Sequence, residues 1–182
     1  TAFLVIPIIT KISEKLGKKN AFIIATILSI IGYALKWWGC NPENPWLMFM
    51  PIPFLSFGIG GLFTLMMSMT ADVCDLDELN NGQRREGMFG AVYWWMVKLG
   101  TAIAMLTSGI VLQMVGFDES IEVQAAETLI NLRVADIVIP IATALIAIIL
   151  IWKYDITEQR AHEIRAALIA RRGEVLHENK HE

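Results

Sequence analysis

The sequence predicts an all-α, polytopic membrane protein with about four and a half transmembrane helices. Its 182 residues are 55% hydrophobic and only 18% charged, and their mean hydropathy is +0.52, which is unusual for a water-soluble domain. The apolar residues stand in unbroken blocks that are long enough to cross a bilayer core of about 30 Å. These blocks lack the polar–apolar alternation of barrel strands, so helices are the expected spanning elements.

The chain opens with an apolar stretch, residues 1–10, that is too short to cross a membrane. Ten residues of helix rise only about 15 Å, so we expect this stretch to be the end of a span whose beginning is missing. The chain is then expected to be the C-terminal portion of a larger protein. Complete spans are expected at residues 21–38, 46–71, 88–116 and 134–152, which makes residues 1–153 one transmembrane unit.

Residues 154–182 are expected to form an amphipathic tail. Asp155 and Glu158 have the spacing of a capping box, which predicts a helix from this point to about Arg172. A narrow apolar stripe on this helix consists of Ala161, Ile164 and Leu168. Arg165 is expected to face elsewhere, so the pattern suits a helix that lies on the inner leaflet or beneath the rest of the protein.

The basic residues predict the orientation of the chain. Most of its 15 lysines and arginines fall in residues 11–19, 84–85 and 153–180, whereas the connections 39–45 and 117–131 contain none. The positive-inside rule places the basic segments, and with them the C-terminus, in the cytoplasm. Because the net charge is −3 and no basic patch is free of lipid-facing sequence, a nucleic-acid partner is not expected. Membrane lipid is the expected surrounding.

The segment between the second and third expected spans, residues 71–87, combines acids with two arginines. Its charged residues are Asp72, Asp75, Asp77, Glu78, Arg84, Arg85 and Glu86. The spacing of Asp72, Asp75 and Glu78 places them on one face of a helical continuation, which the sequence Asn-Asn-Gly at 80–82 would end. The acids need cationic partners, which Arg84 and Arg85 or the lysines of residues 11–19 can supply. Such pairs can latch helix ends in one conformational state; the alternative is a solvated run of charge.

One lysine lies inside the third expected span. Lys98 follows Gly87 by eleven residues, a helical rise of about 16 Å, which places it near the bilayer midplane. A charge there is costly and usually faces a cavity or a partner. Asp136 lies near the outer surface, so any acidic partner is expected from outside this chain; the alternative role is a bridging charge that only joins two parts of the protein. Trp94 and Thr101 share its side of the helix and would suit a sugar, which offers C–H faces and hydroxyls.

Three motifs together resemble a known family. They are Ala-Asp-x-x-Asp-x-x-Glu-Leu from Ala71, Arg-Arg-Glu-Gly from Arg84, and Lys-Leu-Gly from Lys98. In combination they resemble the glycoside–pentoside–hexuronide:cation symporters, the melibiose-permease branch of the major facilitator superfamily.

This resemblance implies the C-terminal part of a twelve-helix transporter of the bacterial inner membrane, from the end of helix 8 through helix 12. It implies symport of a glycoside or oligosaccharide with Na⁺ or H⁺ by alternating access, with Lys98 in the central cavity. No cofactor is implied beyond the coupling cation, whose carboxylates would lie in the missing N-terminal helices. Those helices and the sugar are the expected partners.

Two alternatives are kept open. A lysolipid-type carrier of the same branch would show a groove for a lipid tail. A small four-span subunit without transport activity would pair Lys98 within the chain or across a homo-oligomer. An enzyme is not expected, because the sequence has no Ser/His/Asp set, metal-ligand cluster or phosphate-binding loop.

Overall fold

The computed structural model describes residues 2–39, 44–121 and 123–178, and all regular secondary structure among them is helical. Its elements are α1 (Ala2–Leu16), α2 (Lys18–Gly39), the short 3₁₀ helix η1 (Pro45–Phe49), α3 (Ile52–Asn81), α4 (Glu86–Met114), α5 (Ala126–Trp152) and α6 (Glu158–Glu178). No strand occurs among these residues. The all-α prediction is confirmed.

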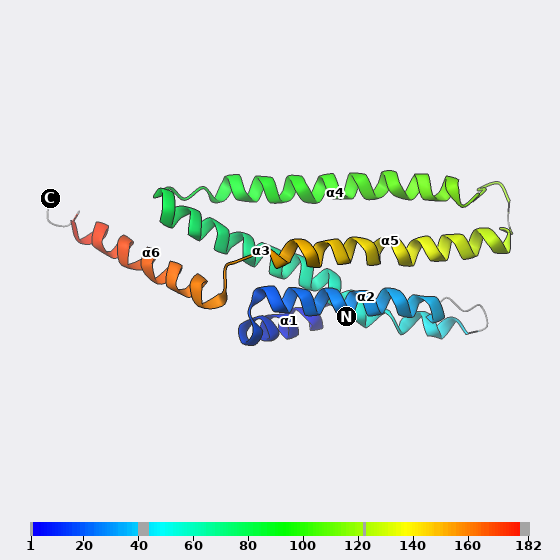
Figure 1. The fold of residues 1–182 in the computed structure, drawn as a ribbon, viewed down its shortest axis with the longest axis horizontal. Coiled ribbons are helices and arrows are strands. Elements are labelled where there is room, and N and C mark those ends of the chain that lie inside the picture. The colour runs from blue at the N-terminus through cyan, green and yellow to red at the C-terminus, as the bar shows by residue number, and fades with distance from the viewer. Residues whose placement is uncertain (1, 40–43, 122, 179–182) are drawn as a thin grey trace.

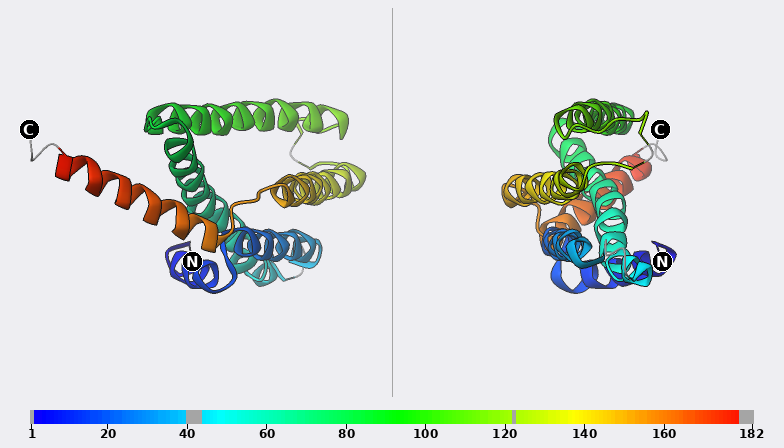
Figure 2. Two further views of the ribbon diagram at one scale, coloured as in Figure 1. Left: turned by 60° about the vertical axis from the view of Figure 1, so that its left-hand side comes forward. Right: turned by 90° about the vertical axis from the view of Figure 1, so that its right-hand side faces the viewer.

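The helices form a bundle from which two elements depart (Figure 1). Helices α1, α2 and α3 pack together, and α5 lies against α2. Helix α4 runs apart from this group and is connected to it at its two ends, while α6 extends away from the end of the bundle at which α3 finishes (Figures 1 and 2).

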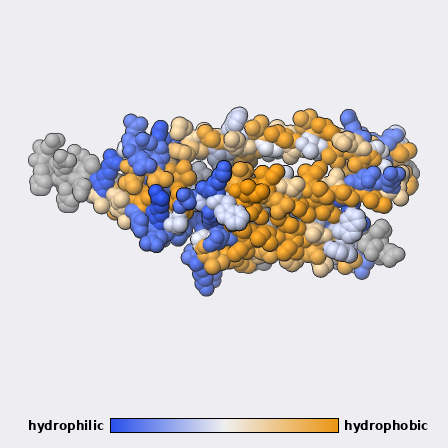
Figure 3. Space-filling view, in the orientation of Figure 1, coloured by the Kyte–Doolittle hydropathy of each residue, from blue (hydrophilic) through white to orange (hydrophobic). Residues whose placement is uncertain are grey.

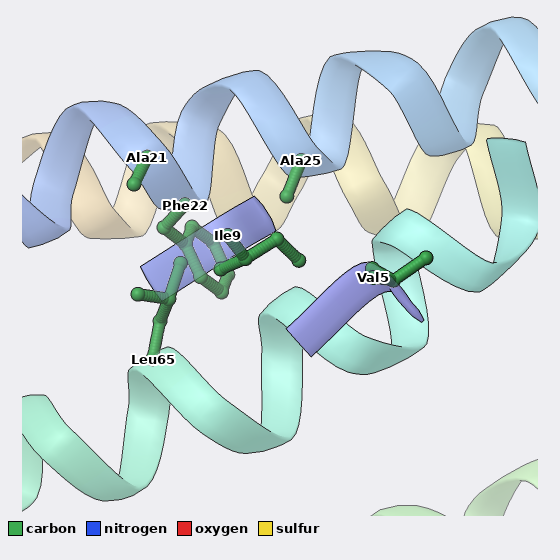
Figure 4. Packing of buried hydrophobic residues seen from close by; sticks show 6 residues of the cluster. All are labelled: Val5, Ile9, Ala21, Phe22, Ala25 and Leu65. Carbon is green, nitrogen blue, oxygen red and sulfur yellow. The ribbon is translucent and has the colours of Figure 1, made fainter. Parts of the chain in front are cut away.

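The core lies where α1, α2 and α3 meet (Figure 4). It consists of Val5, Ile9, Ala21, Phe22, Ala25 and Leu65. Glycines allow α3 to approach α2 closely: a Cβ atom at Gly61 would lie 2.6 Å from the Cβ of Ala25, and one at Gly58 would lie 2.3 Å from Ser29 Oγ. Small residues permit this close backbone contact between membrane helices.

Four segments of the described residues are long and apolar enough to cross a membrane. They are Lys18–Gly39, Pro45–Asn81, Glu86–Met114 and Ala126–Trp152. Their outer surfaces are apolar, as the broad hydrophobic face in Figure 3 shows, and hydrophilic residues gather toward the end that bears α6. No residue of α4 is buried. Apolar surface of this extent needs lipid or further helices to cover it.

Some helices extend further than the expected spans. Helix α3 continues past residue 71 to Asn81 and ends at Gly82, which confirms the helical continuation that the acids of this segment predict. The φ of Gly82, 71°, is left-handed, and its N–H donates to the carbonyl of Glu78 at 2.8 Å, a common helix ending. Helix α5 begins at Ala126 rather than near residue 134, with Glu127 in its first turn, where the helix dipole favours an acid.

The start of α6 also differs from the expectation. Thr157, rather than Asp155, caps the helix, because its Oγ1 accepts the N–H of Arg160 at 3.3 Å. The predicted apolar stripe is confirmed, since Ala161, Ile164 and Leu168 are 3%, 4% and 5% exposed.

Candidate functional sites

A buried carboxylate lies at the centre of a charge network at the C-terminal end of α3. Asp72 is only 2% exposed. Its Oδ2 lies 2.5 Å from Lys18 Nζ at the start of α2, and its Oδ1 lies 2.6 Å from Arg165 Nη2 on α6. A buried charge is stable only when it is paired and hydrogen-bonded. Asp72 therefore ties α2, α3 and α6 together through its two oxygens.

The next acids on the same face of α3 bind Arg84, in the short connection to α4. Arg84 Nη1 lies 3.6 Å from Asp75 Oδ1 and 3.1 Å from Glu78 Oε2, and its Nε lies 2.9 Å from Glu86 Oε2. The hydrogen bonds to Glu86, first, and to Glu78 raise the pKa of Arg84. We call Asp72, Asp75, Glu78, Lys18, Arg84 and Arg165 the charge network.

A separate pair closes the turn after α3. Arg85 donates to both carboxylate oxygens of Asp77, at 2.9 and 2.5 Å, and the same carboxylate accepts a hydrogen bond from Asn81 at 2.8 Å. The expectation that Arg84, Arg85 and a lysine of residues 11–19 would partner the acids is confirmed.

Arg165 is the member of the network that the sequence analysis placed elsewhere. That placement was wrong, because Arg165 also reaches Asp75, with 3.6 Å between Nε and Oδ2. The helical spacing of Arg165 from the apolar stripe indicates that it lies near the packed face of α6. Residue 165 lies four positions after Ala161 and three before Leu168, so it borders the buried stripe of α6.

A lysine beside Lys18 joins α2 to the end of α5. Lys19 Nζ donates to the carbonyls of Trp152 at 2.7 Å and Tyr154 at 3.0 Å, which otherwise have no helical donor. The hydroxyl of Tyr154 is buried without a hydrogen-bond partner among the described residues. Its burial, followed by the negative charge of Asp72, raises the pKa of Tyr154.

Lys98 lies on α4, far from this network along the chain. Its side chain is exposed, and it makes no ion pair or hydrogen bond with any described residue. Trp94 is 48% exposed, and Thr101 donates its hydroxyl proton to the carbonyl of Val97 at 2.9 Å. Asp136 pairs instead with Lys36 of α2. The three predicted cavity residues thus stand together on an uncovered helix, with no acid of the described chain against Lys98.

A cavity of about 580 Å³ separates α4 from α5. The α4 wall includes Gly100, Ala104 and Ser108, and the α5 wall includes Asp136, Pro140 and Thr143. The stripe of small residues on α4 therefore faces open space between the two helices. Lys98 is not among the residues that line this cavity, because two residues along a helix separate it from Gly100 by more than half a turn.

The length and apolar composition of these helices define an integral membrane protein, and the comparison of sequences agrees with this class. The family described as MFS/sugar transport protein matches residues 1–158. The chain belongs to this family, within the glycoside–pentoside–hexuronide:cation symporters of the major facilitator superfamily.

Individual relatives give the same result. The chain is 28% identical over 158 residues to a glucuronide carrier protein homolog of Escherichia coli (strain K12), covering 87% of the chain and 34% of that protein. It is 30% identical over 176 residues to an uncharacterized symporter of Synechocystis sp., covering 94% and 32%. It is 27% identical over 140 residues to an isoprimeverose transporter of Lactiplantibacillus pentosus, covering 77% and 29%. The chain thus spans about a third of the length of these curated relatives.

Proposed function

We propose that this chain supplies the C-terminal helices of a symporter that moves a glycoside or oligosaccharide together with Na⁺ or H⁺ by alternating access. Family membership supports transport, and two relatives are named for a glucuronide and for isoprimeverose, which favours a sugar. The coupling cation binds mainly to helices that precede this chain. The protein lies in the bacterial inner membrane, with the C-terminus in the cytoplasm, as the distribution of basic residues predicts.

The observation that carries this proposal is Lys98, a charge near the middle of a span, which has no partner within the described chain and stands on an uncovered helix. A charge at that depth needs a polar cavity or an opposite charge. In the assembled transporter the ammonium of Lys98 faces the central cavity, where it donates hydrogen bonds to substrate oxygens.

The neighbours of Lys98 complete a surface for a sugar. Trp94 offers an aromatic face against which C–H groups can pack. The hydroxyl of Thr101 donates its proton to the carbonyl of Val97. The hydroxyl oxygen of Thr101 then remains as an acceptor for a substrate hydroxyl. Substrate binds near mid-membrane between two sets of helices, whose rocking exposes it to either side.

The acids and arginines at the end of α3 act as the cytoplasmic gate. Asp72 holds α2, α3 and α6 in place relative to one another, because it is buried and both of its carboxylate oxygens are bound. Asp75, Glu78, Arg84, Arg85 and Glu86 lie nearer to solvent and latch the cytoplasmic ends of the helices in one state.

The direct test is uptake by the full-length protein in proteoliposomes, with radiolabelled glycosides and hexuronides as probes and with an imposed Na⁺ or proton gradient. Accumulation that requires one gradient, and that collapses when this gradient is dissipated, supports symport. Lack of uptake of every sugar under both gradients contradicts it.

The α4–α5 cavity favours a second candidate, a lysolipid-type carrier of the same branch, because its lining is largely apolar and of a size that admits an acyl chain. Uptake of a labelled lysophospholipid in place of sugars would indicate this carrier. The four-span subunit is less favoured, since Lys98 finds no partner in the described chain and no residue of α4 is buried.

A further inference from the structure

Helix α6 binds the end of α3 through ion pairs as well as through its apolar stripe. The stripe residues Ala161, Ile164 and Leu168 are nearly inaccessible to solvent, and α6 packs against α3. Both helices leave the same end of the bundle (Figure 1). The family match ends at residue 158, so α6 lies beyond the part of the chain that the family description covers.

Two arginines of α6 reach α3 from this packed face. Arg165 binds the buried carboxylate of Asp72 and also approaches Asp75. Arg171 lies over the turn that ends α3, where its Nη2 is 2.9 Å from the place that a Cβ atom of Gly82 would occupy. Thus α6 is bound at the centre of the charge network and lies against the terminus of α3 at Gly82.

The charges of the network show what α6 contributes. The acids Asp72, Asp75 and Glu78 face three cations, of which Lys18 comes from α2 and Arg84 from the α3–α4 connection. Arg165 is the contribution of α6. Removal of this cation leaves the acidic face more negative, and Asp75, whose side chain is 18% exposed, then attracts cations from elsewhere.

We propose that α6 is a charge-balancing strap on the cytoplasmic gate, with Arg165 as the positioning residue that fastens it. While α6 is docked, Arg165 neutralises part of the acidic face and weakens its attraction for cations of the other transporter helices. When α6 lifts off, the exposed acids bind those cations and the cytoplasmic side closes more firmly. The effect on the gate rests on the proposed transport function, whereas the docking of α6 does not.

The experiment compares three variants of the full-length protein. Arg165→Gln removes the cation, Arg165→Lys restores a positive charge without the forked geometry, and Arg160→Gln is the matched control, an exposed arginine on the same helix for which no side-chain ion pair is present among the described residues. Hydrogen exchange of residues 158–170 reports docking. Labelling of Thr101→Cys from each side of the membrane, in a Cys40→Ser/Cys74→Ser background, reports the gate.

We expect Arg165→Gln to speed hydrogen exchange of α6 by about tenfold, which corresponds to the loss of one charge-assisted hydrogen bond that is partly open to solvent. Labelling of position 101 should shift toward the outer side, Arg165→Lys should restore part of both effects, and Arg160→Gln should change neither. Wild-type exchange in Arg165→Gln would overturn the strap, as would faster exchange with unchanged labelling. If position 101 of the wild type is labelled from neither side, the proposed cavity is wrong, and hydrogen exchange alone still decides whether Arg165 fastens α6.

Discussion

The replacement Asp72→Asn tests whether the buried carboxylate holds the end of the bundle together. It is nearly isosteric but leaves Lys18, whose side chain is 10% exposed, without its counter-charge. Breaking a buried ion pair by removing one partner costs about 3–5 kcal/mol. The side chain of Arg165 is 42% exposed, so water compensates for much of its loss, and we expect about 3 kcal/mol, the lower end of that range.

The assay is thermal unfolding of the purified full-length transporter in detergent. Asp136→Asn is the matched control, because Asp136 also binds a lysine that joins two helices but its side chain is 51% exposed; its cost should stay within about 1 kcal/mol. A double variant, Lys18→Met with Asp72→Asn, should cost less than the sum of the single changes. Equal losses for Asp72→Asn and Asp136→Asn would refute the reasoning.

Three further predictions follow from the same geometry. Asp72→Asn combined with Asp75→Asn should change the ratio of inner to outer labelling of Thr101→Cys; an unchanged ratio would mean that the acids are only solvated charge. Gly61→Val should destabilise the protein by about 1–3 kcal/mol through overpacking against Ala25, whereas Gly90→Ala, which meets nothing within 4 Å, should be tolerated in the same unfolding assay. Burial raises the pKa of Tyr154, so the hydroxyl ionises more readily in the unfolded chain, and the stability that this pKa difference contributes is present below about pH 10 and falls as the pH rises. Tyr154→Phe should therefore lose less thermal stability than the wild type between pH 9 and 11. Equal losses in the two proteins would contradict the assigned cause.

Much of the fold could be predicted because the membrane imposes it. Long apolar blocks must be helical where lipid leaves no other partner for the backbone. The observed helices contain each expected span except residues 50–51 of the second, which separate η1 from α3, and residues 115–116 of the third. The continuation of α3 to Asn81 could also be predicted, although the segment from Asp72 onward is polar, because its acids have helical spacing and Asn-Asn-Gly at 80–82 marks the end. Ion pairs to Lys18, Arg84 and Arg165 stabilise it as helix.

The sequence predicts some residues of the candidate sites better than others. The acids of α3 could be identified from their helical spacing, and Arg84 from its proximity in sequence. The position of Arg165 beside the apolar stripe indicates that it borders the packed face of α6, but its partner could not be predicted, because it follows Asp72 by 93 residues and only the packing of α6 brings them together. For Lys98 the sequence predicts a depth in the membrane but no partner, and no described residue forms an ion pair or hydrogen bond with it.

The most direct test of the central claim is sugar uptake by the full-length protein carrying Lys98→Gln, measured against Lys153→Gln at matched expression. Lys153 lies at the end of α5, where loss of a charge should leave uptake near the wild-type level. If Lys98 faces the substrate cavity, Lys98→Gln should abolish concentrative uptake or uncouple it from the ion gradient, while the protein remains folded in the membrane. Unchanged, gradient-driven uptake by Lys98→Gln would contradict the account.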